Sequence, residues 1–256
     1  MSIDLSFAIQ KQCYYSYMAL IIGIVFCIGI LLLLHRHKGG FHRQISNRRK
    51  RHAPIYDSAP SYSDKGTEGE DIVFDAVAGT SRAGARIIRN CWLRFPNGSI
   101  TEVDLVLIYK TGIYVVESKN YGECWVFGQD GERFWTRTQY NHRTGERYSR
   151  RFYNPVEQNH VHIDCIRKLI KDWTVPIYSI VAFSNCCELK KVPESTDRLA
   201  VVNYWTLKQA IAQFHIDSDA SLSNEAIVDI YQTLIGNSMS ITQEEKEAHN
   251  NRIKSI

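Results

Sequence analysis

The order of apolar and polar positions along the chain predicts a domain that mixes strands and helices. Two runs rich in Val, Ile and Tyr, residues 99–108 and 112–119, have the composition of β-strands, and Lys110-Thr111 between them predicts a hairpin turn. The nearly continuous apolar run 175–183 is typical of a buried central strand. Further strands are predicted at 86–90, 124–129, 133–138 and 199–204, and helices at 67–77, 207–214 and 225–235, after the N-cap Asn154 and in the polar tail from Gln243.

A long apolar segment near the N-terminus predicts a membrane anchor. Residues 18–34 are 17 residues without a charge, and Tyr14, Tyr15 and Tyr17 extend the segment. As a helix, 14–34 measures about 30 Å, which is enough to span a bilayer core. A cleaved signal peptide is the alternative. It is disfavoured because no small-X-small cleavage site follows the run, and the basic residues come after the run rather than before it.

The charges beside the predicted span set its orientation. Seven Lys or Arg residues and no acid lie within 36–51, whereas only Lys11 precedes the span, offset by Asp4. The positive-inside rule places residues 1–13 outside and the C-terminal bulk in the cytoplasm, at the plasma or inner membrane if the protein is bacterial. The basic run could also be a nucleic-acid patch or a nuclear signal. Beside a membrane helix, topology and attraction to anionic lipid explain it more simply.

Charge and composition divide the chain into segments. Residues 1–52 hold eight Lys or Arg against one acid, and the other 204 residues hold 23 against 26, a balance of −3 within a net charge of +4. The domain therefore gives no general basic signal for nucleic-acid binding. Seven irregularly spaced cysteines without a Cys-X-X-Cys pair predict free thiols rather than a disulfide framework. The expected segments are an N-terminus at 1–13, a span at 14–34, a basic segment and linker at 35–65, the main domain at 66–185, and a strand and helices that complete or flank it at 186–256.

Asp104, Glu117 and Lys119 carry the clearest chemical signal in the chain. If the hairpin turns at Lys110-Thr111, residues whose numbers sum to 221 face each other, and Asp104 pairs with Glu117. Opposed residues have Cβ atoms about 4.5–5.5 Å apart, so the two carboxylates repel unless a cation lies between them. Glu117 and Lys119 share a strand face. The pattern predicts a Mg²⁺ or Mn²⁺ site with a basic group beside it.

Five short segments, in a fixed order, resemble the nuclease-related domain (NERD) family. They are Gly66-Thr-Glu-Gly-Glu70, Arg86-Ile-Ile-Arg-Asn90, Thr101-Glu-Val-Asp104, Gly112-Ile-Tyr-Val-Val-Glu-Ser-Lys-Asn120 and Asn154-Pro-Val-Glu-Gln-Asn159. The resemblance covers about 66–183, and the Asp and Glu-X-Lys spacing is similar to the PD-(D/E)xK nuclease superfamily. It implies a nuclease role and a restriction-endonuclease-like mixed sheet flanked by helices. Val103 and Ser118 depart from the family pattern, which prefers Ile and then Thr or Val there, without touching the chemistry.

Five residues are candidates for the chemistry of phosphodiester hydrolysis. Asp104 and Glu117 are the candidate metal ligands, and Lys119 would orient or deprotonate a water or neutralise the phosphate. By resemblance, Glu70 supplies a further acid, and Gln158 reaches the active site, where an amide can bind phosphate or water. The alternatives are a surface salt bridge between Lys119 and the two acids, and for Glu70 an ordinary exposed helix acid.

The helix predicted after Asn154 also carries two histidines, His160 and His162. A pair of histidines invites interpretation as a metal site. Because the two lie two positions apart on a helix, they point to different sides, and neither is predicted to be a ligand.

A second unusual stretch runs from residue 133 to residue 153. It interleaves six arginines with aromatic residues. Guanidinium groups contact phosphate, and aromatic faces stack on bases. The alternative is a polar hairpin whose aromatic residues finish the core. The candidate nucleic-acid-binding residues are Arg133, Arg137, Arg143, Arg147, Arg150 and Arg151.

Together these patterns predict a single-pass membrane protein whose cytoplasmic α/β domain is a Mg²⁺-dependent nuclease acting on DNA or RNA. The alternative is a membrane-tethered module that keeps the nuclease fold without catalysis and binds nucleic acid or acts as a scaffold. A lipid-surface scaffold using 36–51 is a third hypothesis. Because Asp104→Asn and Glu117→Gln each remove one of two like charges, both metal-free variants are expected to be at least as stable as the parent.

Overall fold

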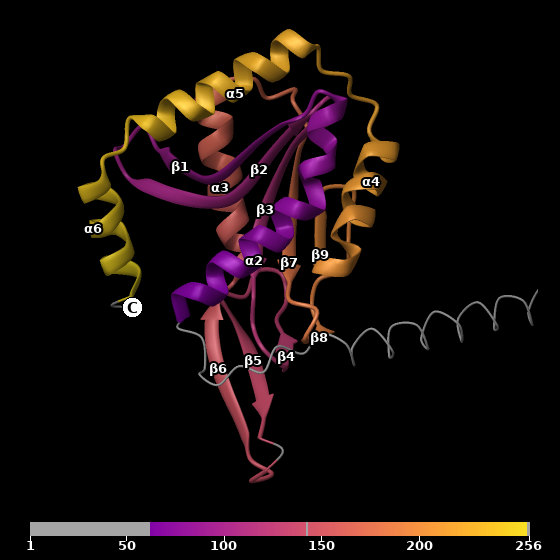
Figure 1. Ribbon diagram of the computed structural model, residues 1–256, viewed down its shortest axis with the longest axis vertical. Coiled ribbons are helices and arrows are strands. Elements are labelled where there is room, and N and C mark those ends of the chain that lie inside the picture. Colours follow the sequence, from indigo (N-terminus) through magenta and orange to yellow (C-terminus); the bar gives the residue numbers. More distant parts are fainter. Residues whose placement is uncertain (1–61, 142, 255–256) are drawn as a thin grey trace, which may run out of the picture. The chain divides into compact units, whose positions relative to one another are not determined.

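The candidate chemistry lies on a five-stranded mixed sheet with the order β1-β2-β3-β7-β9. The computed structural model describes residues 62–141 and 143–254. β1, β2 and β3 pair antiparallel, whereas β3, β7 and β9 pair parallel (Figure 1). The apolar run predicted as a central strand is β7, whose residues are all buried. The strands of this sheet are β1 (Arg86–Arg94), β2 (Ile100–Tyr109), β3 (Gly112–Lys119), β7 (Ile177–Phe183) and β9 (Leu199–Asn203).

The β2–β3 hairpin turns where the sequence predicts. Its paired residues, from Tyr109 and Gly112 to Leu105 and Val116, have numbers that sum to 221. The ladder ends at Leu105 and Val116, one pair before Asp104 would face its partner directly. The predicted register is therefore confirmed up to the edge of the candidate site.

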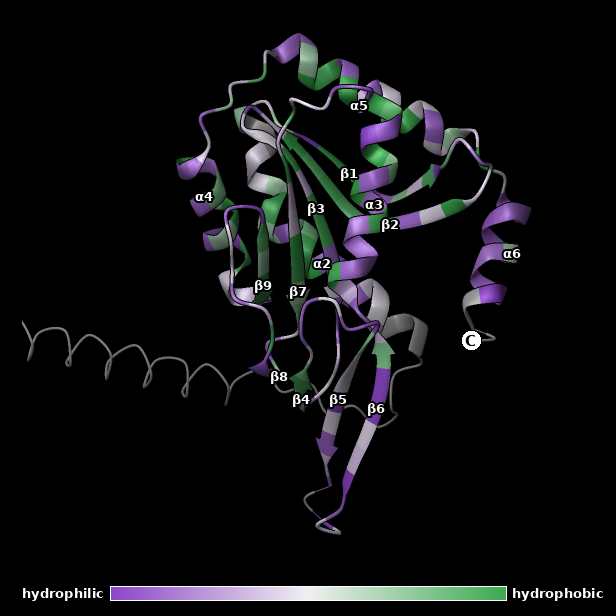
Figure 2. Cartoon of the chain, turned by 180° about the vertical axis from the view of Figure 1, so that it is seen from behind, coloured by the Kyte–Doolittle hydropathy of each residue, from purple (hydrophilic) through white to green (hydrophobic). Residues whose placement is uncertain are grey.

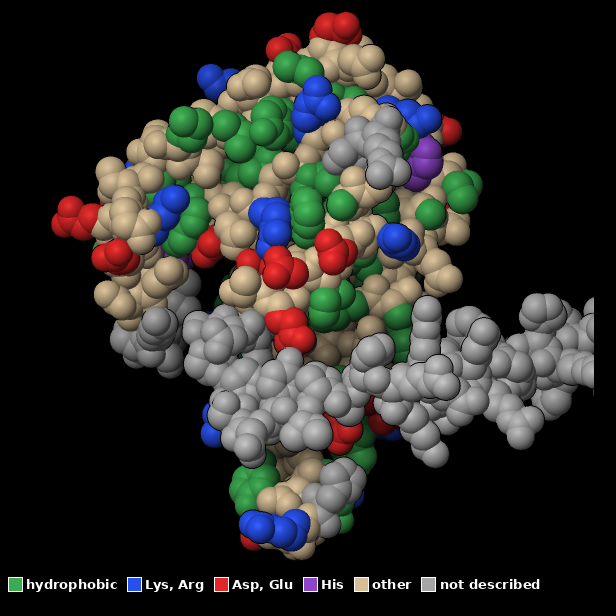
Figure 3. All heavy atoms as spheres, viewed as in Figure 1, with side chains coloured by type: hydrophobic (Ala, Val, Ile, Leu, Met, Phe, Trp, Pro, Cys, Tyr) green, Lys and Arg blue, Asp and Glu red, His purple; other side chains and the backbone are tan. Residues whose placement is uncertain are grey.

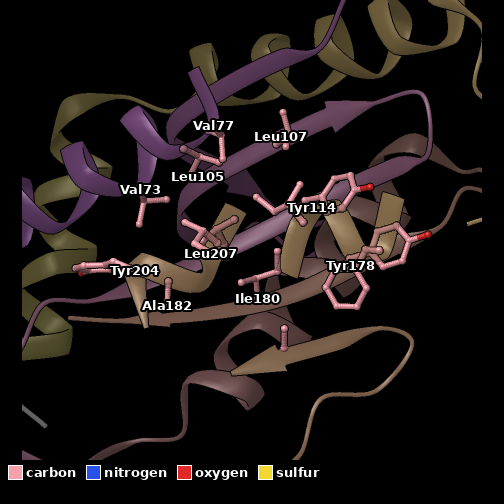
Figure 4. Close-up of a cluster of buried hydrophobic side chains, with 14 of the residues drawn as sticks. Val73, Val77, Leu105, Leu107, Tyr114, Tyr178, Ile180, Ala182, Tyr204 and Leu207 are labelled. Atoms are coloured by element: carbon pink, nitrogen blue, oxygen red, sulfur yellow. The ribbon is translucent and has the colours of Figure 1, made fainter. Parts of the chain in front are cut away.

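Helices cover both faces of the five-stranded sheet. α2 (Tyr62–Val77) and α4 (Leu207–Asp217) pack on one face, in the cluster of buried side chains drawn in Figure 4. α3 (Pro155–Ile170) and α5 (Asn224–Met239) pack on the other face. Alternate residues of β3 enter the two clusters, which is why this strand has an almost continuous apolar sequence. The arrangement confirms a mixed α/β fold flanked by helices.

A smaller second sheet has the order β6-β5-β4-β8. Its strands are β4 (Cys124–Phe127), β5 (Phe134–Tyr140), β6 (Arg147–Tyr153) and β8 (Cys187–Lys191). β4 and β5 are the strands predicted at 124–129 and 133–138, and they pair antiparallel. β5 and β6 form the polar hairpin that was the alternative for residues 133–153, whereas β8 was not predicted. β6 lacks an apolar alternation because all but one of its side chains are exposed. Figure 2 shows the contrast between the hydrophobic strands of the larger sheet and the hydrophilic β6.

Trp135 anchors the second sheet in the core. It is fully buried, in a cluster with Val126, Val156 and Phe183, and its ring stacks on that of Phe183 at 6.3 Å. The hypothesis that aromatic residues of this stretch finish the core therefore holds for Trp135. The hairpin of β5 and β6 extends away from the larger sheet in Figure 1. Its other aromatic residues include three exposed tyrosines, Tyr140, Tyr148 and Tyr153.

The chain after residue 185 contributes β8 and β9 to the two sheets and ends in α6 (Gln243–Lys254). An ion pair ties α6 to β1, with Arg94 Nη1 2.8 Å from Glu245 Oε1. The five described cysteines are free thiols, as predicted.

The predicted span at 14–34 and the basic run at 36–51 lie outside the described residues. Among the helices of 62–141 and 143–254, none combines the length and apolar character needed to cross a bilayer. Short 3₁₀ helices complete the fold at Ala78–Ala83 and Tyr204–Thr206.

Candidate functional site

A local irregularity in β2 places Asp104. Asn90, which the register of β1 and β2 sets opposite Asp104, has a positive φ of 47°. Val103 and Val106 enter the same hydrophobic cluster, although residues three apart on a regular strand point to opposite faces. The alternation of faces is therefore interrupted at Asp104. Its carboxylate reaches β3, where Oδ2 accepts a hydrogen bond from the Ser118 backbone N–H at 2.7 Å.

β3 ends in a buried ion pair. Glu117 is 1% exposed, and its Oε1 accepts a hydrogen bond from Lys119 Nζ at 2.5 Å. Lys119 Nζ also donates to Gln158 Oε1 on α3 at 3.2 Å. The strand pattern correctly places Glu117 and Lys119 on one face. Because Glu117 is buried and only 17% of the Lys119 side chain is exposed, this is not the surface salt bridge that was the alternative.

His162 belongs to this cluster and was not predicted from the sequence. Its Nε2 lies 3.5 Å from Glu117 Oε2, and its Nδ1 lies 3.1 Å from Thr101 Oγ1. His162 is 1% exposed, whereas His160 points to another side of α3 and is exposed, as their spacing predicts. One signal was available in the sequence. His162 lies four positions after Gln158, so the two share a helix face.

Two buried asparagines hold the start of α3 against the sheets. Asn154 caps the helix with its side-chain oxygen, as predicted, and its Nδ2 donates to the Glu132 carbonyl at 2.7 Å. Asn159 Nδ2 donates to the carbonyls of Val115 in β3 and Ile180 in β7, at 3.2 and 3.1 Å. These bonds fix the first two turns of α3 beside the end of β3, where the ion pair lies.

α2 brings Glu70 to the same end of the sheet. Gly69 permits the close approach, because an added Cβ would lie 2.6 Å from Tyr204 Oη. Glu70 is half-buried, and its Oε2 accepts a hydrogen bond from Asn90 Nδ2 at 2.8 Å. Its environment therefore differs from that of an ordinary exposed helix acid. Figure 3 shows acidic side chains gathered over α2 on this face of the molecule.

Asp104, Glu117 and Lys119, the three central groups of the site, differ in the direction in which their surroundings shift their pKa values. Burial, and then repulsion from Glu117, raises the pKa of Asp104 well above its usual range. Burial alone would also raise the pKa of Glu117, but Lys119 and His162 outweigh it and lower that pKa. Burial would lower the pKa of Lys119, yet Glu117 raises it. These shifts favour the protonated form of Lys119, and they disfavour ionisation of Asp104 in the absence of a further cation.

Glu102 is a second acid that sequence reasoning missed. It lies two positions before Asp104 on β2, and both residues line the same cleft. Burial, and then repulsion from Glu70, raises the pKa of Glu102. The signal for it was the spacing of the two acids in Thr101-Glu-Val-Asp104, which alternation places on one side of a strand.

The side chains present fit a small, hard cation. Asp104 and Glu117 offer carboxylate oxygens, and Glu117 Oε2 is buried without a hydrogen-bond partner among the described residues. In 62–141 and 143–254, no group of three or more His, Cys, Asp or Glu side chains forms a complete metal site. Mg²⁺ suits such an incomplete set, because it keeps several waters and is often held by one or two carboxylates together with substrate phosphates.

The six candidate arginines do not form one surface. The pairing of β5 with β6 sets Arg137 opposite Arg150 and Thr136 opposite Arg151. Because side chains alternate along a strand, Arg150 and Arg151 lie on opposite faces of the hairpin. Figure 3 shows Lys or Arg side chains at the far end of this hairpin. Of the six, Arg133 and Arg151 line the cleft beside the acids, Arg137 and Arg150 lie on the other face, Arg147 starts β6, and Arg143 lies in the turn.

A cleft of about 720 Å³ joins the acids to the base of the hairpin. Asp104 lines it from β2 and Gln158 from α3. Arg133, Arg151 and Tyr153 line it from the hairpin. The cleft thus brings Glu102 and Asp104 together with two of the six arginines, although 47 positions separate Asp104 from Arg151 in the sequence.

The fold and the site together define a class of protein, an α/β domain whose central strands end in a group of acids around a largely buried lysine. Residues 65–184 match the family model described as Nuclease-related domain (NERD). The family predicted from the five sequence segments is confirmed. An uncharacterized protein of Bacillus anthracis is 29% identical over 186 residues, which cover 73% of this chain and 79% of that protein.

Proposed function

We propose that this protein is a divalent-cation-dependent nuclease with a restriction-endonuclease-like site of the PD-(D/E)xK kind. One observation carries the proposal, the buried pair of Glu117 and Lys119 beside Asp104 in a nuclease-related domain. Buried charges cost stability unless they are fully paired, and here Glu117 Oε2 is buried without a hydrogen-bond partner among the described residues, with only His162 Nε2 at 3.5 Å beside it. A catalytic role explains this arrangement of charges better than a contribution to the stability of the fold does.

Each residue has a role that follows from its contacts. Asp104 and Glu117 hold Mg²⁺ or Mn²⁺, which supplies Lewis-acid polarisation of the phosphate. Lys119 is protonated, so it stabilises negative charge that develops on the phosphate. Gln158 holds Lys119 through its side-chain oxygen and presents its amide N–H groups to phosphate or water. Glu70 is the acid outside the ion pair that accepts the proton of the attacking water.

The proposed reaction is hydrolysis of a phosphodiester bond. A water oxygen forms the new P–O bond, and the P–O bond to the leaving sugar oxygen breaks. The water gives up one proton and the leaving oxygen gains one. Because Lys119 is already a cation, it faces the leaving oxygen or the phosphate as a donor, while a carboxylate takes the water proton.

We expect the full-length chain to cut labelled DNA, RNA or both in Mg²⁺ or Mn²⁺, and to cut neither in EDTA. The physical reason is that without the cation the phosphate is not polarised and the two acids repel it. Products resolved on a denaturing gel measure the effect. If the chain binds nucleic acid but leaves it intact under every metal condition, the alternative of a membrane-tethered binding module replaces the nuclease.

We further propose that residues 14–34 anchor the domain in a membrane, with 1–13 outside, the domain in the cytoplasm and 36–51 against anionic lipid. The uncharged run and the seven basic residues after it support this proposal. The chain is expected to stay with membranes after an alkaline carbonate wash, and a cytoplasm-specific reporter fused after Ile256 is expected to be active. Release by the wash would contradict the anchor. Activity of an exported reporter alone would invert the orientation.

A further inference from the structure

We infer that the cleft beside Asp104 is a subsite for one unpaired nucleotide, so that the substrate is single-stranded nucleic acid or a single-stranded segment next to a duplex. The inference rests on the proposed function for the position of the bond that is cut. The subsite itself rests on the hairpin residues that line the cleft, none of which is among the candidate catalytic residues.

The cleft has the size and lining that a nucleotide requires. Its volume of about 720 Å³ lies within the range of sites for small ligands. Acids line it on the side of β2, and Arg133, Phe134 and Tyr153 line it on the side of the hairpin. One side of the cleft carries the candidate cation ligand Asp104, and the other side carries basic and aromatic side chains. These two sides match a ligand that has one phosphate to be cut, a second phosphate and a flat base.

Two guanidinium groups are positioned at this wall by one aromatic ring. The Cζ atoms of Arg133 and Arg151 lie 5.3 and 4.6 Å from the centre of the Phe134 ring. Both arginines are exposed, and within the part of the chain that the structure describes no ion pair joins either of them to a carboxylate. An arginine held over a ring and not neutralised by an acid keeps its N–H groups for phosphate.

Tyr153 provides the aromatic surface. It is 44% exposed, although its strand neighbour Phe152 packs into the core cluster. Tyr153 is the cross-strand partner of Phe134, and the two rings meet edge to face at 6.3 Å and 86°. Protein aromatic rings stack on bases that are unstacked from their neighbours, whereas the faces of bases inside a duplex are already covered. This difference favours a single strand as the occupant.

Residues on opposite faces of the hairpin supply matched controls. Arg151 lies on the cleft face and Arg150 on the other face. Substitution of either by Gln removes the same charge, so the two variants differ in the face that is changed. Tyr153 and Tyr148 form a second pair, 44% and 51% exposed. The full-length chain carrying Asp104→Asn, which keeps the probe intact, is titrated in EDTA. The probes are labelled oligothymidylate, labelled oligouridylate and a blunt duplex of the same length.

We expect tighter binding of the single strands than of the duplex. Tyr153→Ala is expected to weaken single-strand binding about 5- to 100-fold, the loss that follows removal of one stacked base. Arg151→Gln is expected to weaken it about tenfold and to reduce the salt slope by about 0.7, because one phosphate contact is lost. Tyr148→Ala and Arg150→Gln are expected to leave both quantities unchanged.

Equal effects within each matched pair, or a duplex bound as tightly as the single strands, would overturn the subsite. If the parent cuts nucleic acid in a metal-dependent way but these binding differences are missing, the nuclease stands and the subsite falls. If the differences are present but the parent cuts nothing, the subsite stands and the nuclease falls. Thermal unfolding shows whether each variant is folded. If Tyr153→Ala does not fold, the comparison of Arg151→Gln with Arg150→Gln, both at exposed positions, tests the subsite.

Discussion

Glu117→Gln is expected to lower the free energy of unfolding of the metal-free domain by about 3 kcal/mol. The substitution removes the carboxylate that neutralises Lys119 and leaves an ammonium group buried beside Gln158. Breaking a buried pair from one side costs about 3–5 kcal/mol. The Lys119 side chain keeps 17% exposure to water, which places the effect at the lower end of that range. The expectation from the strand pattern was that this variant is at least as stable as the parent. It is replaced here because that pattern does not reveal how little of the Lys119 side chain is exposed.

Urea unfolding in EDTA measures this effect, and a double substitution provides its control. Glu117→Gln combined with Lys119→Met is expected to recover most of the lost stability, because no charge then remains buried at the end of β3. An unfolding midpoint for Glu117→Gln equal to that of the parent would show that the Glu117–Lys119 pair contributes nothing to the folded state.

Asp104→Asn is expected to slow metal-dependent cleavage about a thousandfold or more without destabilising the domain. The side-chain oxygen of Asn can still accept the Ser118 N–H, and the repulsion from Glu117 disappears. The loss of rate arises because one of two candidate cation ligands is gone, and a bound cation contributes several kcal/mol of charge stabilisation in the transition state.

Initial rates of cleavage and urea unfolding, measured on the same preparation, separate the two effects of Asp104→Asn. Asp130→Asn is the matched control, because it makes the same chemical change in the exposed turn between β4 and β5. Full nuclease activity in Asp104→Asn would move the active site elsewhere while leaving the family assignment intact.

Much of the site could be predicted because its central part is local in the sequence. The turn at Lys110-Thr111 and the alternation of apolar side chains fix the register of β2 and β3, and this register brings Asp104 and Glu117 to one end of the sheet. The position of Asn154 as an N-cap followed by proline likewise predicted the start of α3. Each of these inferences depends on residues close in the chain.

The parts that escaped prediction depend on packing between distant segments. Gln158, 39 positions from Lys119, was placed at the site only by the family resemblance, and the buried contact of His162 with Glu117 exists only because α3 lies against β3. The interruption of alternation at Asp104 lies opposite Asn90, a residue with a positive φ on the neighbouring strand. The six arginines between residues 133 and 151 were interpreted from the sequence as one basic surface, whereas the pairing of β5 with β6 divides them between two faces of the hairpin. Apart from the spacing of four positions between Gln158 and His162, none of these relations leaves a periodic signal in the sequence.

The central claim is that Asp104 and Glu117 jointly hold a divalent cation for phosphodiester hydrolysis. Titration of Mn²⁺ into the full-length chain, with the free ion followed by electron paramagnetic resonance, tests it most directly. The parent is expected to bind Mn²⁺ at a site that Asp104→Asn removes and Asp130→Asn leaves intact. Equal Mn²⁺ binding by the parent and Asp104→Asn would contradict the claim, and so would the absence of Mn²⁺ binding by a parent chain that cleaves nucleic acid.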